Sequence, residues 1–230
     1  MSSNGRYELK FILDESKYTD VIRWLNTTVP SRRSYPGRFV NSVYFDDPEF
    51  TAVKDNLTGV SDRQKLRLRW YDSPGNPSSK PKLELKVREG RLGFKHHFTL
   101  DSFPEDIYSL LFTKFTEQIK ENITDNTDAC KIFSTHLSPS LYVNYYRDYF
   151  EAPFDLRITI DSKISYRLPD PFSCISKSIS ATYTHRIMEI KFPPPEKNNV
   201  SRLLNNLHLI PKRHSKYLMG LSMHGQVTYI

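Results

Sequence analysis

The sequence has few of the residues and segments that mark several common protein classes. Only Cys130 and Cys174 are present, too few for a disulfide framework, and we expect both to be reduced, buried thiols. Glycine is scarce, at 8 residues, which argues against a low-complexity chain. No apolar run approaches the length of a membrane span, and the N-terminus lacks a signal-peptide pattern. These absences predict a soluble, cytoplasmic protein with no membrane segment.

The signals of some kinds of function are also missing. No pairing of a nucleophile with a general base suggests a covalent phospho-enzyme. The formal net charge of +7 predicts an anionic partner, but no nucleic-acid recognition motif accompanies it. No internal repeat and no long linker divides the chain, so residues 1–230 are predicted to form one domain with a core at about 6–222.

Aromatic residues are plentiful, with 14 Tyr and 14 Phe, and they favour β-structure. Runs of β-branched and aromatic residues alternate with charges at period two, which is the pattern of strands with two unlike faces. The predicted strands are Arg6–Leu13, Phe39–Asp46, Arg63–Tyr71, Lys82–Glu89, Leu92–Leu100, Leu141–Phe150, Leu156–Ile164 and Arg186–Phe192.

Helical spacing of apolar residues fills the gaps between these strands. Asp14 is a predicted N-cap for a helix with Tyr18, Val21 and Leu25 on one face. Further helices are predicted at Pro104–Lys120, Glu196–Leu207 and Tyr217–Met223, and a short one after a break at Asn122–Asp128. Turns are predicted at Asp72–Pro77, Glu89–Arg91 and Ala152–Pro153.

Charged residues share one face of several strands, because residues i, i+2 and i+4 of a strand point the same way. The aligned sets are Arg6 with Glu8 and Lys10, Lys65 with Arg67 and Arg69, Glu84 with Lys86 and Arg88, Tyr145 with Arg147, Arg157 with Thr159 and Asp161, and Glu189 with Lys191. For a single strand, the simpler interpretation is a sheet whose charged face is in water. Recurrence in at least six strands, with large apolar faces behind, instead predicts an α+β fold. In that fold a closed antiparallel β-barrel forms a cationic tunnel, with helices packed outside.

A cationic interior suits phosphate, because Arg gives bidentate contacts and Lys a compact charge. A polyphosphate carries a charge at every unit, so rows of cations along strands match its repeat. Carboxylates within the lining could hold Mg²⁺ or Mn²⁺ against phosphate oxygens.

The charged strand motifs, taken in order, resemble those of a known family, the polyphosphate-polymerase (VTC) domain of the vacuolar transporter chaperone complex. This domain lies within the triphosphate tunnel metalloenzyme (CYTH-like) superfamily. The matching segments, in order, are Arg6–Phe11, Val43–Asp46, Lys65–Tyr71, Glu84–Lys86, Tyr145–Arg147, Arg157–Asp161, Glu189–Lys191 and Ser215–Tyr217. The resemblance implies a metal-dependent transfer of the γ-phosphate of ATP onto a growing polyphosphate chain.

The resemblance also implies residue roles. The catalytic cations would be Lys10, Arg67, Arg69, Arg147, Arg157 and Lys216. Further phosphate ligands would be Lys65, Lys86, Lys95, Tyr145, Lys191, Arg213 and Ser215, with Lys212 as the alternative to Arg213. The metal, Mn²⁺ or Mg²⁺, would be held by Glu189, with Glu8 as a second candidate ligand.

One departure from the family pattern bears on the chemistry. Many tunnel hydrolases and cyclases have Glu-x-Glu-x-Lys in the first strand, and here the first of those positions is Arg6. This favours a polymerase over a two-metal hydrolase. The alternatives are a triphosphate or polyphosphate hydrolase on the same scaffold, and a polyphosphate-binding module without turnover.

Several residues are predicted to have structural roles only. His96 and His97 should point to opposite faces of one strand, which is poor geometry for a shared metal. Trp24 and Trp70 are expected in the core. The Asp46-Asp47 pair is expected to form a turn and cap a helix.

Overall fold

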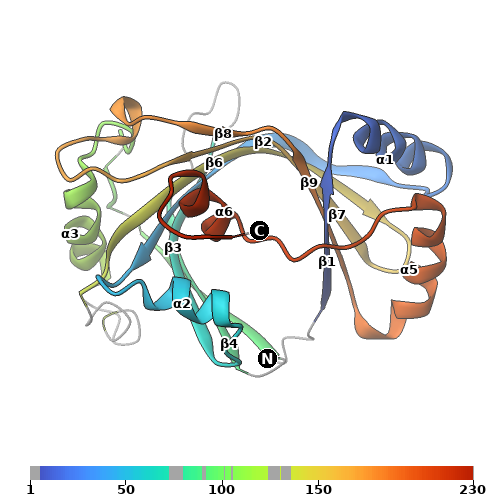
Figure 1. Cartoon of the computed structure of the whole chain (residues 1–230), viewed down its shortest axis with the longest axis horizontal. Helices are drawn as coiled ribbons and strands as arrows, with labels where there is room; N and C mark the ends of the chain where they lie inside the picture. The colour runs from blue at the N-terminus through green and yellow to red at the C-terminus, as the bar shows by residue number, and fades with distance from the viewer. Residues whose placement is uncertain are drawn as a thin grey trace. The chain divides into compact units, whose positions relative to one another are not determined.

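The structure is a computed structural model, and it describes residues 6–72, 80–89, 92–100, 102–104, 106–123, 130 and 136–229 (Figure 1). The turns predicted at Asp72–Pro77 and Glu89–Arg91 lie mostly outside the described residues. The same holds for most of the predicted break at Asn122–Asp128 and for the short helix expected after it.

The predicted strands are all present, several with longer bounds. The strands are β1 Tyr7–Leu13, β2 Arg32–Asp46, β3 Arg63–Asp72, β4 Lys82–Glu89, β5 Leu92–Thr99, β6 Ser138–Ala152, β7 Leu156–Arg167, β8 Ala181–Tyr183 and β9 Arg186–Phe192. The helices are α1 Glu15–Thr27, α2 Thr51–Thr58, α3 Phe112–Ile123, α5 Lys197–Leu204 and α6 Lys216–Met223, with single 3₁₀ turns η1 Ile175–Lys177, η2 Pro194–Glu196 and η3 Asn205–Leu207.

The predicted closure of the sheet into a barrel is wrong. The hydrogen-bonded order is β1-β9-β7-β6-β2-β3-β4-β5, with β8 paired to β7, so β1 and β5 are the two ends of an open sheet in the part of the chain that is described. The pairs β1–β9, β7–β9, β3–β4 and β4–β5 are antiparallel, so the α+β class holds. Closure depends on strand tilt and stagger, which period-two alternation does not encode.

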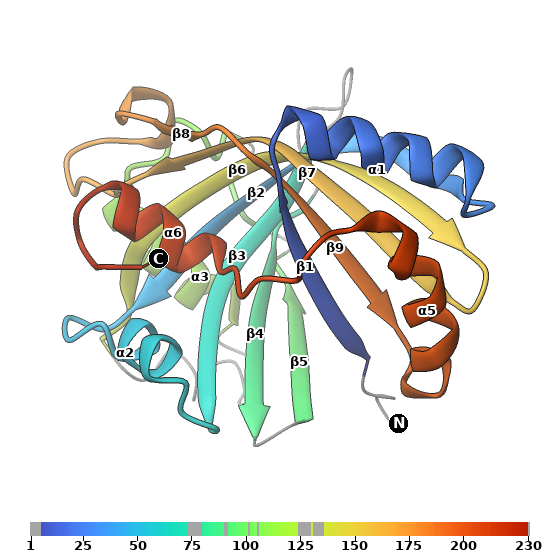
Figure 2. The same ribbon diagram turned by 45° about the vertical axis from the view of Figure 1, so that its right-hand side comes forward.

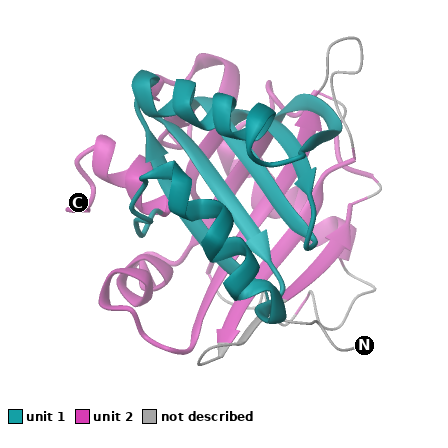
Figure 3. Ribbon diagram, turned by 90° about the vertical axis from the view of Figure 1, so that its right-hand side faces the viewer, with its two compact units in different colours: residues 1–39, 145–164, 183–214 teal, residues 40–144, 165–182, 215–230 magenta. Residues whose placement is uncertain are grey.

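Two compact units make up the chain, each from three separate stretches (Figure 3). Unit 1 comprises Met1–Phe39, Tyr145–Ile164 and Tyr183–His214. Unit 2 comprises Val40–Asn144, Ser165–Thr182 and Ser215–Ile230. The prediction of one domain stays a prediction.

In unit 1, helices α1 and α5 cover the apolar face of β1, β9 and β7 (Figure 3). Asp14 caps α1 as predicted, because its side chain accepts a hydrogen bond from Lys17 N at 2.9 Å. Trp24 is buried in this core, and its indole N–H donates to the carbonyl of Leu203 at 3.0 Å. That hydrogen bond joins α1 to α5. The charged residues of β1, β9 and β7 alternate with the apolar ones and so lie on the other face of these strands.

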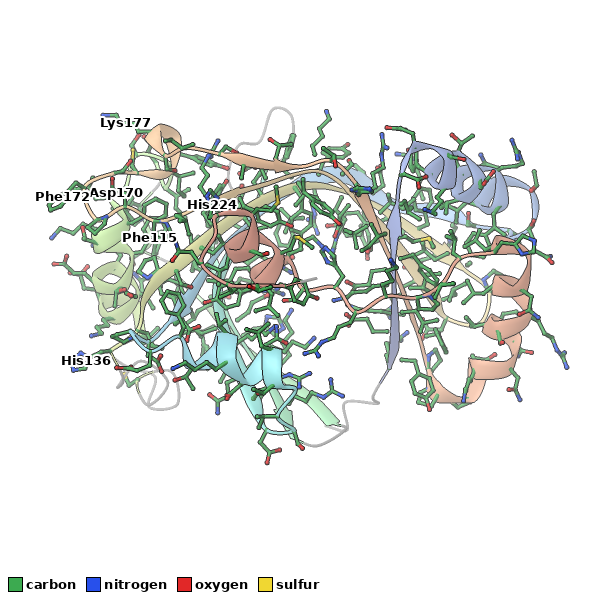
Figure 4. All side chains as sticks on the ribbon, in the orientation of Figure 1. Phe115, His136, Asp170, Phe172, Lys177 and His224 are labelled. Carbon is green, nitrogen blue, oxygen red and sulfur yellow. The ribbon has the colours of Figure 1, made fainter. Side chains whose placement is uncertain are left out.

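In unit 2, β3, β4 and β5 lie side by side (Figure 2), and α3 packs on the apolar face of this group. Phe115 of α3, labelled in Figure 4, is fully buried with Trp70 in one cluster. The predicted helix Pro104–Lys120 begins later, at Phe112. The reason is that Leu111 forms a β-bridge with Cys174, which holds the preceding residues out of the helix.

Short helices α2 and α6 complete unit 2. The N-cap position of α2 is Phe50, but the Asp46-Asp47 pair bonds to the first turn as a cap would: Asp46 accepts from Ala52 N at 3.0 Å and Asp47 from Thr51 N at 2.9 Å. Helix α6 packs closely, because a Cβ built on Gly220 would lie 2.5 Å from side-chain carbons of β6 and β7. The sheet therefore fixes where the start of α6 lies within the unit.

Two remaining predictions concern solvent exposure and the membrane. Cys174 is buried as expected, but Cys130 is exposed, so the prediction of two buried thiols is wrong for Cys130. No helix within the described ranges is both long enough and apolar enough to cross a bilayer.

Candidate functional site

In unit 2, the strand register gathers the predicted cations on one face. Directly paired residues of antiparallel strands point to the same face of the sheet. The charged pairs between β3 and β4 are Arg63–Arg88, Lys65–Lys86, Arg67–Glu84 and Arg69–Lys82. Between β4 and β5 the corresponding pairs are Glu84–His97 and Lys86–Lys95. We call these ten residues the unit 2 polar face. It combines eight Lys or Arg residues with one carboxylate, that of Glu84.

Three lysines form a row across this face. Lys65, Lys86 and Lys95 are direct cross-strand neighbours on β3, β4 and β5. Like charges directly opposite one another destabilise a sheet. A row of this kind is therefore costly to the empty protein and becomes favourable when an anion lies over it.

Glu84 sits among the cations of the same face. Its side chain is 4 % exposed, and it accepts from Arg67 Nε at 2.7 Å and from Lys95 Nζ at 2.8 Å. Arg69 Nη1 lies 3.7 Å from Glu84 Oε2, and His97 Nδ1 lies 3.5 Å from Glu84 Oε1. Burial would raise the pKa of Glu84, but the charges of Arg67 and Arg69 and the hydrogen bond from Lys95 outweigh it and lower the pKa to about 2. Glu84 is therefore a carboxylate at neutral pH.

The two arginines of β3 are further anchored to β2. Arg67 NH1 donates to Tyr44 Oη at 3.3 Å, and Arg69 Nε donates to Ser42 Oγ at 3.3 Å. Burial opposes ionisation of the Tyr44 phenol, yet the charges of Arg67 and Arg69 outweigh it and lower its pKa. The ring of Tyr44 also stacks on Tyr217 of α6, with centroids 4.8 Å apart. These contacts limit the positions that the guanidinium groups can take.

The start of α6 lies beside the lysine row. Ser215 is the N-cap of α6, and its hydroxyl accepts from Leu218 N at 3.4 Å and from Lys65 Nζ at 3.4 Å. Asn56 of α2 donates to the same hydroxyl at 3.3 Å. Lys216, the first residue of the helix, follows directly. A helix N-terminus with adjacent lysines favours a phosphate group.

In unit 1, the pairing of β1, β9 and β7 builds a second charged face. One row is Glu8–Lys191–Arg157, and the next is Lys10–Glu189–Thr159. We call these six residues the unit 1 polar face. It contains three cations and two carboxylates, so it is closer to charge balance than the face of unit 2.

Ion pairs link the residues of the unit 1 polar face. Lys191 Nζ lies 2.5 Å from Glu189 Oε1 and 3.7 Å from Glu8 Oε2. Lys10 Nζ lies 3.0 Å from Glu8 Oε1 and donates to the carbonyl of His214 at 3.0 Å. The two predicted metal ligands, Glu8 and Glu189, thus contact a common lysine.

The residues of this face fit a hard divalent cation in part. Thr159 lies directly across from Glu189, and its buried hydroxyl has no hydrogen-bond partner among the described residues. Magnesium commonly takes only one or two carboxylates from the protein and the rest from water and phosphate. The described residues contain no group of three His, Cys, Asp or Glu side chains suited to a metal. Glu189 and Glu8 could therefore hold a metal only together with oxygens from a ligand.

Arg147 of β6 is held by a buried carboxylate. Its Nε and NH2 donate to the two oxygens of Asp161 at 2.6 and 2.8 Å, and Asp161 is fully buried. Burial disfavours the charged guanidinium, but Asp161 outweighs it and raises the pKa of Arg147 well above its ordinary value. Arg147 also lies over the ring of Tyr145 at 5.1 Å. The bidentate pair fixes the plane of the guanidinium.

The structure brings most of the predicted site residues together within their units. In unit 2 these are Lys65, Lys86, Lys95, Arg67 and Arg69, with Ser215 and Lys216. In unit 1 they are Lys10, Lys191, Glu189 and Glu8, with Arg147 beside Tyr145. Arg157 has a side chain 57 % exposed and 3.6 Å from Asp155. Lys212 and Arg213 are both exposed, so the choice between them stays open.

Glu84, Asp161 and Tyr44 have contacts in the site that no motif in the sequence predicted. Glu84 shares its strand face with Lys86 and Arg88, which the alternation in Lys82–Glu89 already indicated. A second signal required the strand register: among the described polar-face residues of β3 and β5 there is no other carboxylate, so Glu84 is the one that the surrounding cations share.

A family model described as the VTC domain matches residues 5–224, nearly the whole chain. The chain belongs to the VTC domain family. It is 26% identical over 236 residues to vacuolar transporter chaperone complex subunit 2 of Saccharomyces cerevisiae. That match covers 80% of this chain but 28% of the relative, so the chain spans less than a third of the curated relative. The family resemblance seen in the motifs is confirmed.

Similar solved structures show the fold alone, since their sequence identities are low. A protein from Pyrococcus horikoshii OT3 matches with a TM-score of 0.52 and 14% identity, over 96% of this chain and 98% of that one. A putative adenylyl cyclase from Hippeastrum, described as having a dominant triphosphatase activity, matches with a TM-score of 0.53 and 15% identity. That match covers 97% of this chain and 98% of the cyclase.

Proposed function

We propose that this domain binds polyphosphate and the triphosphate of ATP, and that it is a metal-dependent polyphosphate polymerase. The observation that carries the proposal is the unit 2 polar face, where eight Lys or Arg residues share a surface with one carboxylate. Polyphosphate has a negative charge at each unit, so it is the kind of anion that such a surface would favour. Membership of the VTC family supports the same substrate class.

In the proposed reaction, an oxygen of the terminal phosphate of the chain attacks the γ-phosphorus of ATP. The bond from that phosphorus to the β–γ bridging oxygen breaks, and ADP leaves. Charge spreads over the transferred group, so positioning and cationic stabilisation do most of the work. Arg67, Arg69, Lys10, Arg147, Arg157 and Lys216 are the proposed catalytic cations. Lys65, Lys86, Lys95, Lys191, Arg213, Tyr145 and Ser215 are the proposed further phosphate ligands.

Glu189, with Glu8 beside it, would hold the divalent metal, Mn²⁺ or Mg²⁺. When bound, the metal would neutralise charge on the phosphate oxygens. A bound metal would also offset the repulsion between these carboxylates and the phosphate oxygens.

A second candidate is a polyphosphate-binding module without turnover. One observation favours it: both proposed metal ligands, Glu189 and Glu8, already form ion pairs with Lys191. The Coulombic case for anion binding is the same for both candidates, so only an activity measurement separates them.

The deciding experiment is incubation of the purified protein with ATP and Mn²⁺, followed by separation of the products on a gel. A ladder of polyphosphate supports the polymerase. Free phosphate without a ladder indicates a hydrolase, and the absence of turnover with retained triphosphate binding indicates the binding module. The same assay without metal tests the metal requirement.

Glu189→Gln separates binding from chemistry. We expect it to abolish metal-dependent turnover while triphosphate binding without metal persists or tightens, because a negative charge is removed from among cations. The matched control is Glu15→Gln, which removes an exposed glutamate of α1 from its ion pair with Arg186 of β9. An active Glu189→Gln protein with an unchanged metal requirement would exclude Glu189 as a metal ligand.

A further inference from the structure

Glu84 is the carboxylate of the unit 2 polar face, and it is more deeply buried than the cations around it. Its side chain is 4 % exposed, against 21 % for Arg67 and 41 % for Lys95. A buried charge is tolerated only when partners compensate its lost hydration. Glu84 has such partners on both of its oxygens.

The contacts of Glu84 are divided evenly between its oxygens. Oε2 lies 2.7 Å from Arg67 Nε and 3.7 Å from Arg69 Nη1. Oε1 lies 2.8 Å from Lys95 Nζ and 3.5 Å from His97 Nδ1. A metal at either oxygen would have to displace one of these side chains. The geometry is that of a counter-ion and not that of a metal ligand.

The partners of Glu84 differ in how firmly they are held elsewhere. Arg67 has a second anchor in Tyr44 Oη, and Arg69 has one in Ser42 Oγ. Lys95 has the most exposed side chain of the three and a long, flexible stem. Lys95 is thus the cation that can turn from Glu84 toward a ligand with the least rearrangement.

We propose that Glu84 is an internal counter-ion of the anion site, which stabilises the empty protein and competes with bound phosphate for Lys95. The inference rests on the proposed function and deepens it. Glu84 acts through its neighbours, so it is a positioning residue. It also sets the affinity, because each phosphate that binds must do so against the negative charge already present.

The first test is triphosphate binding without metal, measured by calorimetry for the wild type and Glu84→Gln. We expect Glu84→Gln to bind about tenfold more tightly, the scale of one close charge pair. We also expect its affinity to fall more steeply with salt, because the site has gained net positive charge. The control is Glu117→Gln, which removes an exposed glutamate from an ion pair with Lys114 in the same unit and should leave binding unchanged. Unchanged or weaker binding by Glu84→Gln would overturn the proposal.

The second test needs no triphosphate, so it separates this inference from the proposed function. The empty Glu84→Gln protein should melt at a lower temperature than the wild type at low ionic strength, because its cations repel one another. Added sodium sulfate should recover most of that loss, and should recover more than it adds to the wild type. A loss that sulfate does not recover would mean that Glu84 is only a packing residue, whatever the wild type does with triphosphate. If sulfate does recover the loss but the wild type binds no triphosphate, the counter-ion stands and the proposed function fails.

A double variant covers the case in which Glu84→Gln does not fold. Glu84→Gln with Lys95→Met removes one negative and one positive charge together, so the net charge of the face is kept. We expect the double variant to fold and to melt above the single variant, with triphosphate affinity back within about threefold of the wild type. A double variant as unstable as the single one, or one that also fails to fold, would contradict the counter-ion role.

Discussion

Three lysines, Lys65, Lys86 and Lys95, occupy neighbouring positions in the sheet. Selection for stability alone would not place three like charges side by side. They face one another across three adjacent strands, where like charges are destabilising. Residues kept for binding commonly reduce stability in this way. The row therefore predicts opposite effects of one substitution on stability and on affinity.

Lys86→Gln should raise the melting temperature of the empty protein and weaken triphosphate binding. Lys86 is the middle lysine, so its removal relieves repulsion on both sides and also removes one cation from the proposed ligand set. We expect a loss of affinity of about fivefold to tenfold, measured by calorimetry beside a thermal melt. The control is Lys114→Gln on α3, an exposed lysine paired with Glu117. A Lys86→Gln protein that is less stable and binds as tightly as before would show that the lysine has only a structural role.

The acid stability of the protein should depend on Glu84. Its pKa in the folded protein is lowered from 4.5 to about 2, so the folded state prefers the ionised form. Its contribution to stability is then complete above the unfolded-state pKa and is lost as the pH falls through the folded-state pKa. The stability advantage of the wild type over Glu84→Gln should be fully present at neutral pH and should shrink as the pH falls from 4.5 to about 2.

Urea unfolding of both proteins across this pH range gives the measurement. Other carboxylates titrate in the same range, but they titrate in both proteins, so the difference between them reports Glu84. An advantage of the wild type that stays the same at pH 3 and below would contradict the lowered pKa.

At the scale of elements, the alternation along each strand was sufficient to predict which residues share a face. Lys65, Arg67 and Arg69 do share one, and His96 and His97 pair with Leu85 and Glu84 respectively, on opposite faces as predicted. Helix bounds were harder to predict where a tertiary contact decides them. The Leu111–Cys174 bridge delays the start of α3, and no local pattern encodes a partner so distant in sequence.

Cross-strand partners were the other feature that the sequence could not supply. The position of Glu84 among Arg67, Arg69, Lys95 and His97 follows from the register of β3, β4 and β5. Register in turn depends on turns and packing that alternation along one strand does not specify. The bidentate contact between Asp161 and Arg147 was missed for the same reason.

The position of helix α6 depends on the close packing of Gly220 against the sheet. Its Gly220 faces Leu141 and Tyr166, and a Cβ there would lie 2.5 Å from a carbon of each side chain. Gly220→Ala should displace α6 and with it Ser215 and Lys216 at its start. We expect a loss of about 1–3 kcal/mol in the free energy of unfolding and weaker triphosphate binding.

Urea unfolding and calorimetry measure both effects, with Ser222→Ala on the same helix as the control. The control removes a hydroxyl whose hydrogen bond to the Tyr229 carbonyl is long, at 3.5 Å. Normal stability of Gly220→Ala would mean that α6 tolerates a shift. Normal binding despite lost stability would mean that the start of α6 takes no part in the site.

At the scale of the whole molecule, the same alternation was consistent with more than one architecture. A charged face and an apolar face occur on any sheet covered on one side, whether or not its two end strands meet. The described sheet runs from β1 to β5 without joining them, and each of the two compact units has a charged face of its own. The family match over residues 5–224 and the fold-level likeness to solved structures relate the whole chain to known proteins.

Triphosphate should stabilise the whole molecule by mass action. A ligand that binds only the folded state at one hundred times its dissociation constant adds about 2.7 kcal/mol to the free energy of unfolding. For a chain of 230 residues, each kcal/mol raises the melting temperature by about 2–4 °C, so the expected shift is about 5–10 °C. A thermal melt with increasing sodium triphosphate, without metal, gives the measurement.

The size of the shift distinguishes a built site from a general effect of salt on a protein of net charge +7. Sodium chloride at matched ionic strength screens repulsion among all the cations, whereas triphosphate at a site is bound at low concentration and gives a logarithmic rise. We expect micromolar triphosphate to raise the melting temperature where sodium chloride of the same ionic strength has no effect. Arg67→Ala should reduce the triphosphate shift, because it removes a cation held at the centre of the unit 2 polar face by Glu84 and Tyr44. A melting curve that does not move at saturating triphosphate, or that moves equally with sodium chloride, would mean that the cations do not form a binding site.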